Sequence, residues 1–467
     1  KIDIRTVSQD NGTVQVNLST GQSLVLVSDY AQLSVLDGDP DPQDTNIQIK
    51  LGNATTEIEG ESLGSSLGGY FASRDIIDDA QKEIGQLSLA FADAMNTQNK
   101  LGMTLNNTIG GDLFTLPTSN AQAYSSNSGT GAISASVIPG SGSDITPNDL
   151  YVEFTGANTY DVYILDGDIK TPLMSGSTPP ATADVVSTSG VKYGLQLTIS
   201  GSPTTNDKFL LQPTKDAAKG LNAEVTRAED LALASPLQLN SKANNYGSAE
   251  ISLVGVYNTD TTTSLFTSSG LDPAAPHKVV INSTGDYDIY DGNTPSTLIG
   301  TAAASTNGVN LLANAKLAGV NVYADPTVYP GFELSIDGSV TASDEFYIAF
   351  NTNGFSDNKN GLALASLQTS DLVRKGNSTA ADNKMTFSEA FSATLTDVGT
   401  TVSSLKTSTS AADAKLTQSQ ELYESVAGVN LHEEASNLLR YQQAYAASAQ
   451  VITTARDTFD ALLSAVG

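Results

Sequence analysis

One segment of the chain has the spacing of a serine nucleophile. Gly64-Ser65-Ser66-Leu67-Gly68 matches the G-x-S-x-G pattern, which holds a serine on a sharp turn between a buried strand and a helix. Such a serine needs a histidine as its base, and the chain has only His277 and His432. No buried strand is predicted before the segment, His277 lies in a Pro- and Ala-rich loop, and His432 lies in a predicted helix. We therefore expect no catalytic triad and no enzyme.

An acidic loop near the amino terminus has the residue types of a calcium site. Its carboxylates are Asp37, Asp39, Asp41 and Asp44. A calcium loop of the EF-hand type needs glycine at its sixth position and glutamate at its twelfth, but Pro42 and Gln48 stand there. Because runs of charge normally lie in water, a solvated loop is the expectation. The same holds for Asp286, Asp288 and Asp291, whose positions turn chemistry explains.

Composition excludes several classes of site. The chain has no cysteine and two histidines, so disulfides, thiolate metal sites and cysteine nucleophiles are excluded and a transition-metal site is disfavoured. No Walker loop, dinucleotide fingerprint or catalytic carboxylate pair stands in a recognisable setting. We therefore expect no cofactor and no metal.

Charge and hydropathy limit the kinds of partner that the chain can have. The net charge of −28 disfavours nucleic acid and anionic membrane surfaces, since both need clustered Lys and Arg. No run approaches the roughly 18 apolar residues of a membrane span, and no signal-peptide pattern is present. The 467 residues are enough for two to five domains.

The strongest periodic signal lies at the carboxyl end. Apolar residues follow a four-three spacing there, which is the seam of a coiled coil; they are Leu431, Ala435, Leu438, Tyr445, Ala449, Ile452, Phe459, Leu463 and Val466. Gln442 and Arg456 are the interruptions, and Asn430 is the predicted N-cap. Such a seam must be buried against another part of the chain or another molecule.

Two further helices are predicted. Residues 72–98 carry apolar side chains at three- and four-residue intervals, and Asp residues crowd the first turns. Residues 385–427 continue a four-three register that includes Leu395, Val402 and Leu405. We expect these two helices to pack antiparallel as a stalk.

The remaining segments have the pattern of strands. Residues 1–60 predict hairpins, the first of them turning at Asn11-Gly12. The Ser-, Thr- and Gly-rich middle contains an internal repeat, in which residues 193–201 align with 330–338 and residues 207–209 align with 344–346. Residues 160–163 likewise resemble 287–290. This repeat predicts two related β modules, each a small sandwich or barrel.

Together these signals predict an α+β multidomain protein in which long antiparallel, coiled-coil-like helices form a stalk that carries two inserted all-β modules. The expected division is residues 1–116 (first half of a core domain), 117–236 (first β module), 237–374 (second β module), 375–427 (returning helix) and 428–467 (terminal coiled-coil helix).

Three segments also resemble a known family. Residues 428–452, GVNLHEEASNLLRYQQAYAASAQVI, are similar to the carboxyl-terminal signature of bacterial flagellar axial proteins. Residues 68–75, followed by a long helix and by residues 99–102, resemble a core helix of the hook-associated, hook–filament junction members of that family. Residues 357–368 resemble their strand-to-helix return segment. These segments reach the start, middle and end of the chain.

The resemblance implies a structural protein of the flagellum. It implies a secreted subunit that passes unfolded through a narrow export channel, with no cleaved signal peptide, and then self-assembles through terminal helices. It also implies a family helix before Lys1 as partner of the carboxyl-terminal seam, which would make this chain amino-terminally truncated. The implied partners are other copies in a helical ring, the hook protein, a second junction protein and an export chaperone on the terminal helix.

The seam is accordingly the predicted assembly and chaperone interface, and its large residues are Leu431, Leu438, Tyr445, Ile452, Phe459 and Leu463. An ordinary intramolecular helical bundle would also explain it. The rival function is an extracellular adhesin or glycan-binding protein that uses the tandem β modules. Its aromatic platforms would be Tyr151, Tyr160 and Tyr163, or Tyr287 and Tyr290, but the chain has no Trp.

Overall fold

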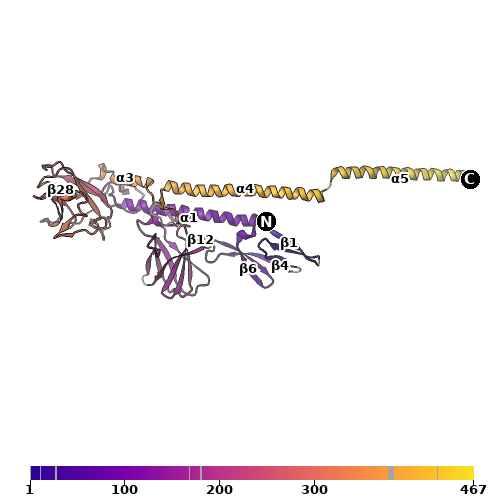
Figure 1. The fold of residues 1–467 in the computed structure, drawn as a ribbon, viewed down its shortest axis with the longest axis horizontal. Coiled ribbons are helices and arrows are strands. Elements are labelled where there is room, and N and C mark those ends of the chain that lie inside the picture. Colours follow the sequence, from indigo (N-terminus) through magenta and orange to yellow (C-terminus); the bar gives the residue numbers. More distant parts are fainter. Residues whose placement is uncertain are drawn as a thin grey trace. The chain divides into compact units, whose positions relative to one another are not determined.

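The computed structural model describes residues 2–10, 12–26, 29–167, 169–178, 181–376, 383–428 and 430–466. The chain divides into two compact units, residues 1–395 and residues 396–467, which are described in turn (Figure 1).

The first unit begins with a six-stranded antiparallel meander. Its strands are β1 (Ile4–Ser8), β2 (Val14–Leu18), β3 (Ser23–Leu26), β4 (Asp29–Asp37), β5 (Thr45–Leu51) and β6 (Ala54–Ile58). β1 pairs with β2, which confirms the first predicted hairpin, although Asn11 of its turn lies outside the described residues. Leu18, Ile47 and Ile58 are buried on one side of this sheet, where Phe71 packs against them.

Helix α1 (Ser65–Lys100) begins earlier than the predicted 72–98. The glycines of the G-x-S-x-G segment, which favoured a loop, lie at its amino-terminal end. A Cβ at Gly68 would lie 2.6 Å from the carbonyl oxygen of Glu61, so close packing against the preceding 3-10 turn (Gly60–Leu63) requires glycine there. Tertiary contact therefore outweighs the low helix propensity of glycine.

A two-sheet module follows α1, and we name it the first β module. One sheet contains β14 (Thr182–Val186), β15 (Lys192–Ser200), β10 (Ala132–Val137) and β8 (Ser119–Asn120). The other contains β13 (Ile169–Ser177), β12 (Thr159–Asp166), β11 (Leu150–Gly156), β16 (Lys208–Leu211) and β9 (Gln122–Ala123). Phe154, Tyr160 and Phe209 lie in the core between the sheets. A short ladder of β7 (Phe114–Thr115) and β17 (Asn222–Ala223) and helix α2 (Ala217–Gly220) flank this module.

A second module, the second β module, lies between residues 237 and 350 and contains three sheets. Its largest sheet contains β18 (Leu237–Ser241), β28 (Glu345–Phe350), β22 (Lys278–Ile281), β23 (Tyr287–Tyr290), β24 (Leu298–Ala302), β25 (Lys316–Leu317) and β26 (Val320–Asn321). β19 (Glu250–Val256) pairs with β27 (Phe332–Asp337), and β20 (Phe266–Thr267) with β21 (Gly270–Leu271). Phe266, Phe332 and Phe346 are buried in its core.

The segments aligned as a repeat occupy equivalent strands. β15 pairs with β10 as β27 pairs with β19, and β16 lies between β9 and β11 as β28 lies between β18 and β22. Gly194 and Gly331 both have positive φ, 69° and 100°, at the start of the equivalent strands. The limits 117–236 and 237–374 stay predictions.

The chain then returns along α1. Helix α3 (Lys359–Ser366) is fastened to α1 by Asn360, whose Nδ2 donates to the carbonyl oxygen of Gln98 at 3.1 Å. β29 (Val373–Arg374) pairs with β30 (Lys384–Met385) before helix α4 (Phe387–Ala427). Thr386 and Glu389 form a capping box at the start of α4, because each accepts a hydrogen bond from the backbone amide of the other.

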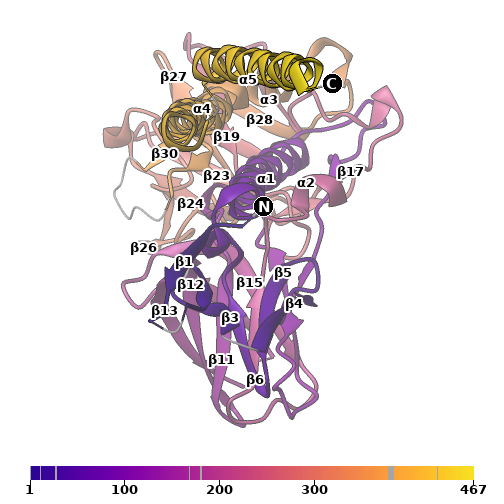
Figure 2. The same cartoon turned by 90° about the vertical axis from the view of Figure 1, so that its right-hand side faces the viewer.

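Contacts between α1 and α4 lie at the first turn of α4. The Phe387 ring is 5.6 Å from that of Phe91 on α1, and Ala390 is buried with Ala90. Figure 2, a view nearly along α1, places the six-stranded sheet and the first β module on the same side of α1. The longer antiparallel stalk stays a prediction.

The second unit holds the rest of α4 and helix α5 (Leu431–Val466). The amide of His432 donates to Oδ1 of Asn430 at 3.0 Å, which confirms Asn430 as the N-cap. Within the described ranges, no helix is both long and apolar enough to cross a membrane.

Candidate assembly interface

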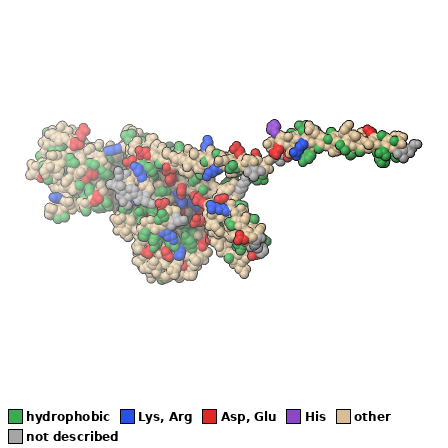
Figure 3. Space-filling model, turned by 45° about the vertical axis from the view of Figure 1, so that its right-hand side comes forward, with side chains coloured by type: hydrophobic (Ala, Val, Ile, Leu, Met, Phe, Trp, Pro, Cys, Tyr) green, Lys and Arg blue, Asp and Glu red, His purple; other side chains and the backbone are tan. Residues whose placement is uncertain are grey.

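All six large residues of the predicted seam are exposed on α5. They are Leu431, Leu438, Tyr445, Ile452, Phe459 and Leu463, and the least exposed, Leu463, still has 57% of its surface accessible. Figure 3 shows hydrophobic side chains along this helix. The side chain of Val466, the last seam position, lies outside the described residues. Each large apolar side chain left in water forgoes about 1.5–3 kcal/mol of burial free energy. The seam is thus a surface with a strong tendency to associate.

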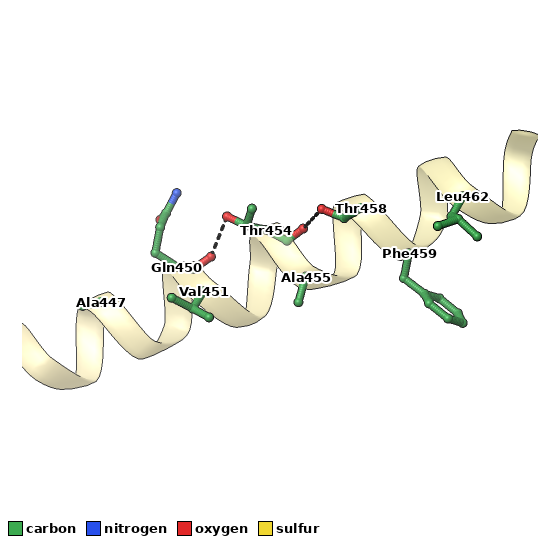
Figure 4. Close-up of a pocket in the computed structure, with 8 residues that line it drawn as sticks. All are labelled: Ala447, Gln450, Val451, Thr454, Ala455, Thr458, Phe459 and Leu462. Carbon is green, nitrogen blue, oxygen red and sulfur yellow. Dashed lines mark hydrogen bonds between the residues drawn. The ribbon is translucent and has the colours of Figure 1, made fainter.

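A second apolar strip lies beside the seam. Figure 4 shows it from Ala447 to Leu462, with Val451, Ala455 and Phe459 projecting from the helix. Thr454 and Thr458 turn their hydroxyls back to the carbonyl oxygens of Gln450 and Thr454, at 2.9 and 2.7 Å. Their hydroxyls are thereby satisfied within the helix, so these threonines add little polarity to the strip.

Our reading of the sequence missed this strip, although a signal for it exists. Val451, Ala455, Thr458 and Leu462 follow their own four-three spacing, one helix face away from the seam. Small and β-branched residues at these positions weakened the pattern in comparison with the leucines of the seam. Helix α5 therefore presents an apolar surface wider than one coiled-coil seam.

The charge around this interface is average for the chain. Residues 396–467 carry eight Asp and Glu and four Lys and Arg, a net charge of −4, whereas the whole chain carries −28. Like charges on neighbouring copies repel and are costly to desolvate. The second unit has about the same net charge per residue as the rest of the chain, and its apolar side chains, not its charge, distinguish it.

The serine, histidine and aspartate residues considered above lie in ordinary structural settings. Ser65 lies in the first turn of α1, and Nδ1 of His277 is 2.8 Å from the carbonyl oxygen of Ala275. Asp291 accepts hydrogen bonds from the backbone amides of Asn293 and Thr297, as expected of a turn residue, although its side chain is buried. The turn interpretation is wrong for Asp288, which lies in β23 and accepts a hydrogen bond from the Thr301 hydroxyl on the neighbouring strand. Among the described residues, no group of three His, Cys, Asp or Glu side chains could hold a metal ion.

The prediction of a solvated acidic loop is wrong for Asp41. This side chain is 2% exposed, and its Oδ2 lies 2.6 Å from Nζ of Lys215. Burial alone would raise the pKa of Asp41, but the hydrogen bonds from Lys215 and from the backbone amide of Gln43, together with the charge of Lys215, hold the pKa below its ordinary value. Burial would likewise lower the pKa of Lys215, and Asp41 raises it instead.

The aromatic platforms of the rival function are mostly interior. Tyr151, Tyr160 and Tyr287 are 2%, 1% and 4% exposed. Tyr160 packs against Phe154 with ring centres 5.7 Å apart, and Nζ of Lys170 lies 3.3 Å from the centre of the Tyr151 ring. Strand alternation directs Tyr160 and Tyr287 into the module cores, so neither can stack on a sugar. Tyr151 lies on the other face of its strand and is covered by Tyr124 and Lys170, whereas Tyr163 and Tyr290 are half-buried.

Comparison with known proteins points to one family. Residues 1–114 match the model of the flagellar hook-associated protein FlgK helical domain, and residues 421–465 match that of the flagellar basal body rod FlgEFG protein C-terminal. The flagellar hook-associated proteins 1 of Escherichia coli (strain K12) and Salmonella typhimurium are each 27% identical over 468 aligned residues, covering 99% of this chain and 61% of theirs.

The chain thus spans about three fifths of the length of these curated relatives. A solved structure, the flagellar hook junction protein FlgK from Burkholderia pseudomallei, has the same fold, with a TM-score of 0.68 at 24% identity over 90% of this chain and 75% of that one. With family-model matches at both ends of the sequence and relatives aligned along nearly all of it, the chain is similar to flagellar hook-associated proteins 1.

Proposed function

We propose that this chain is a structural subunit of the bacterial flagellum that forms the junction between hook and filament. The observation that carries the proposal is the exposed apolar surface of α5, centred on Leu438, Tyr445 and Ile452. Its relatives are named hook-associated proteins, and the solved structure with the same fold is a hook junction protein. Among the described residues nothing supports a catalytic role, so the chain acts by assembly.

Assembly buries the seam between copies. Six large apolar side chains represent on the order of 10 kcal/mol of burial free energy before the entropic cost of association. Contacts between unlike surfaces of identical copies propagate into a helical ring rather than a closed dimer. In this arrangement α5 lies in the inner tube, while the acidic β modules face the surrounding water outside the cell.

The same surface serves other partners in turn. Before assembly, an export chaperone covers the exposed face of α5 in a helix-in-groove complex. After export, copies of this chain contact the hook protein on one side and a second junction protein on the other. Nucleic acid and membrane are not partners, because the chain is strongly acidic.

Two pairs of substitutions on one helix test the proposal. Leu438→Asp with Ile452→Asp places charge in the seam, and we expect loss of hook–filament junctions and of chaperone binding. Ser436→Asp with Gln443→Asp places the same charges on the opposite face of α5, where both residues are exposed, and controls for helix propensity and net charge. Junction assembly and chaperone binding that survive the seam pair as well as the control pair would refute the role of the seam.

A further inference from the structure

The acidic loop between β4 and β5 connects the six-stranded sheet to the first β module. Oδ1 of Asp39 accepts a hydrogen bond from the backbone amide of Ser125 at 2.8 Å, and Oδ2 accepts one from its hydroxyl at 2.7 Å. Two residues later, Asp41 forms its buried ion pair with Lys215, which follows β16 of the module. A loop of one domain thus binds two separate segments of another.

Helix α1 completes this contact. Nη2 of Arg74 lies 2.7 Å from Oδ1 of Asp44, and Nε2 of Gln81 donates to the carbonyl oxygen of Lys215 at 2.7 Å. Nζ of Lys82 lies 2.9 Å from Oδ2 of Asp149 in the module. The loop, the helix and the module are therefore linked by charged groups, several of which are buried, and breaking a buried pair is costly.

The second β module is attached to α1 in a different way. The hydroxyl of Thr259 donates to the carbonyl oxygen of Lys100 at 2.6 Å, and the amide of Ile109, just after the helix, donates to that of Ser268 at 3.1 Å. Both hydrogen bonds join uncharged groups. Within the part of the chain that the structure describes, no ion pair joins α1 to this module. The two hydrogen bonds lie at the last residue of α1 and just beyond it.

A cleft separates the two modules at this end of α1. It has a volume of about 910 Å³ and is lined by Lys100, by residues 109–116, by Pro139 and Gly140 next to the first module, and by residues 257–261 of the second. The second module therefore has room on the side that faces the first module, and its hydrogen bonds to the end of α1 are uncharged. A charged group contacts it at this end from α3, where Nζ of Lys359 donates to the carbonyl oxygen of Leu253 at 3.1 Å.

We propose that residues 39–44 are a latch that locks the six-stranded sheet, α1 and the first β module into one rigid body, while the second β module turns about the end of α1. The difference follows from the kind of attachment. The buried pair of Asp41 and Lys215, with more exposed charged contacts on three elements around it, fixes the orientation of the first module. No ion pair joins α1 to the second module among the described residues, and the hydrogen bonds between them cluster at one helix end, which acts as a hinge. The inference rests on the described contacts and not on the proposed function.

Spin labels test this directly, because the chain has no cysteine of its own. Labels at Thr55→Cys and Thr182→Cys, both exposed, report the distance between sheet and first module. Labels at Thr182→Cys and Ser296→Cys report the distance between the modules. We expect a narrow distance distribution for the first pair and a broad one for the second. Distributions of equal width would overturn the proposal.

Variants of the latch give the second arm of the test. Lys215→Met should broaden the sheet–module distribution and speed hydrogen exchange at the Ser125 amide by roughly tenfold or more, since that amide is bonded across the latch. Two further variants replace Lys215→Met if that variant does not fold. Asp41→Asn with Lys215→Met leaves no uncompensated buried charge, and Asp39→Ala removes only an exposed contact. Lys242→Met makes the same substitution in an exposed pair inside the second module, with Glu345 at 2.7 Å, and controls for the loss of one cation. Latch variants that match this control would overturn the proposal.

Discussion

Asp207 and Asp344 occupy equivalent positions in the two β modules and make equivalent bonds. The carboxylate of Asp207 accepts from the backbone amides of Ser128, Gly129 and Thr204. That of Asp344 accepts from the amides of Tyr246, Gly247 and Thr341. Both side chains are at most 1% exposed. Each carboxylate thus ties two loops to the strand that follows it, and the repeat extends to the hydrogen bonds.

Removing either carboxylate should open the loops of its own module. Asp207→Ala removes the acceptor of three partly buried hydrogen bonds from backbone amides, so we expect a loss of about 1–3 kcal/mol in the free energy of unfolding. Asp344→Ala should do the same to the second module. Asp184→Ala, which removes an exposed carboxylate bonded to Gln196, is the control and should change stability by less than about 0.5 kcal/mol. Hydrogen exchange at β16 and β28 measures each effect, and exchange as slow as in the control would contradict it.

Acid should weaken the bonds of Asp207. Burial alone would raise its pKa, but the hydrogen bonds from Thr204, Ser128 and Gly129 hold the pKa below its ordinary value. Its contribution to stability is therefore complete above the unfolded pKa of about 3.9 and is lost as the pH falls through the folded pKa. Exchange at β16 measured against pH should show this loss in the native chain, and Asp207→Asn should lack it.

The contribution of Asp93, on α1, to stability should depend on pH in the opposite direction. It is 3% exposed, and burial raises its pKa although the amides of Gly142 and Gly140 donate to it. The folded chain therefore binds this proton more tightly than the unfolded chain. Stability should fall as the pH rises from about 3.9 to the folded pKa and then level off. Asp93→Asn should abolish that fall in urea unfolding measured against pH, and a slope that persists in this variant would contradict the assignment.

Two glycines of α1 should respond in opposite ways to alanine. A Cβ at Gly85 would lie 1.8 Å from the carbonyl oxygen of Thr214, so Gly85→Ala must push the helix away from the first β module. We expect a loss of about 1–3 kcal/mol. A Cβ at Gly69 meets nothing within 4 Å, and Gly69→Ala should stabilise the same helix by about 0.5–1 kcal/mol. Thermal unfolding of the two variants measures the difference, and equal melting temperatures would contradict it.

The local patterns in the sequence predicted more of the fold than the long-range ones. The N-cap at Asn430 and the hairpin of β1 and β2 depend on spacing within a few residues. The equivalence of β15 with β27 depends on a short motif that recurs along the chain. Asp41 could not be placed in this way, because its partner Lys215 lies 174 residues further along the chain. An aspartate in a loop is ordinarily solvated. Asp41 is buried because the fold brings the Lys215 ammonium next to it.

Two other errors had signals that were set aside. Tyr160 shares a strand face with Val162 and Ile164, so period two already directed it into the core and away from a sugar. The start of α1 was predicted too late because glycine has a low helix propensity. Propensity does not include the close approach of another chain segment, which requires glycine at Gly68. For the assembly surface, the seam was predictable as a pattern, but its second strip was obscured by Ala455 and Thr458.

The central claim is that α5 is covered by other copies in the assembled flagellum. Ile452→Cys introduces the single thiol of the chain at a seam residue that is 70% exposed in the isolated structure. Its rate of maleimide labelling, compared between the purified chain and isolated flagella, measures that cover. Thr182→Cys on the first β module controls for access of the reagent. Because a buried seam excludes the reagent, we expect Ile452→Cys to be labelled at least roughly tenfold more slowly in flagella than in the purified chain. Labelling of Thr182→Cys should change little. Equal labelling of Ile452→Cys in both states would contradict the central claim.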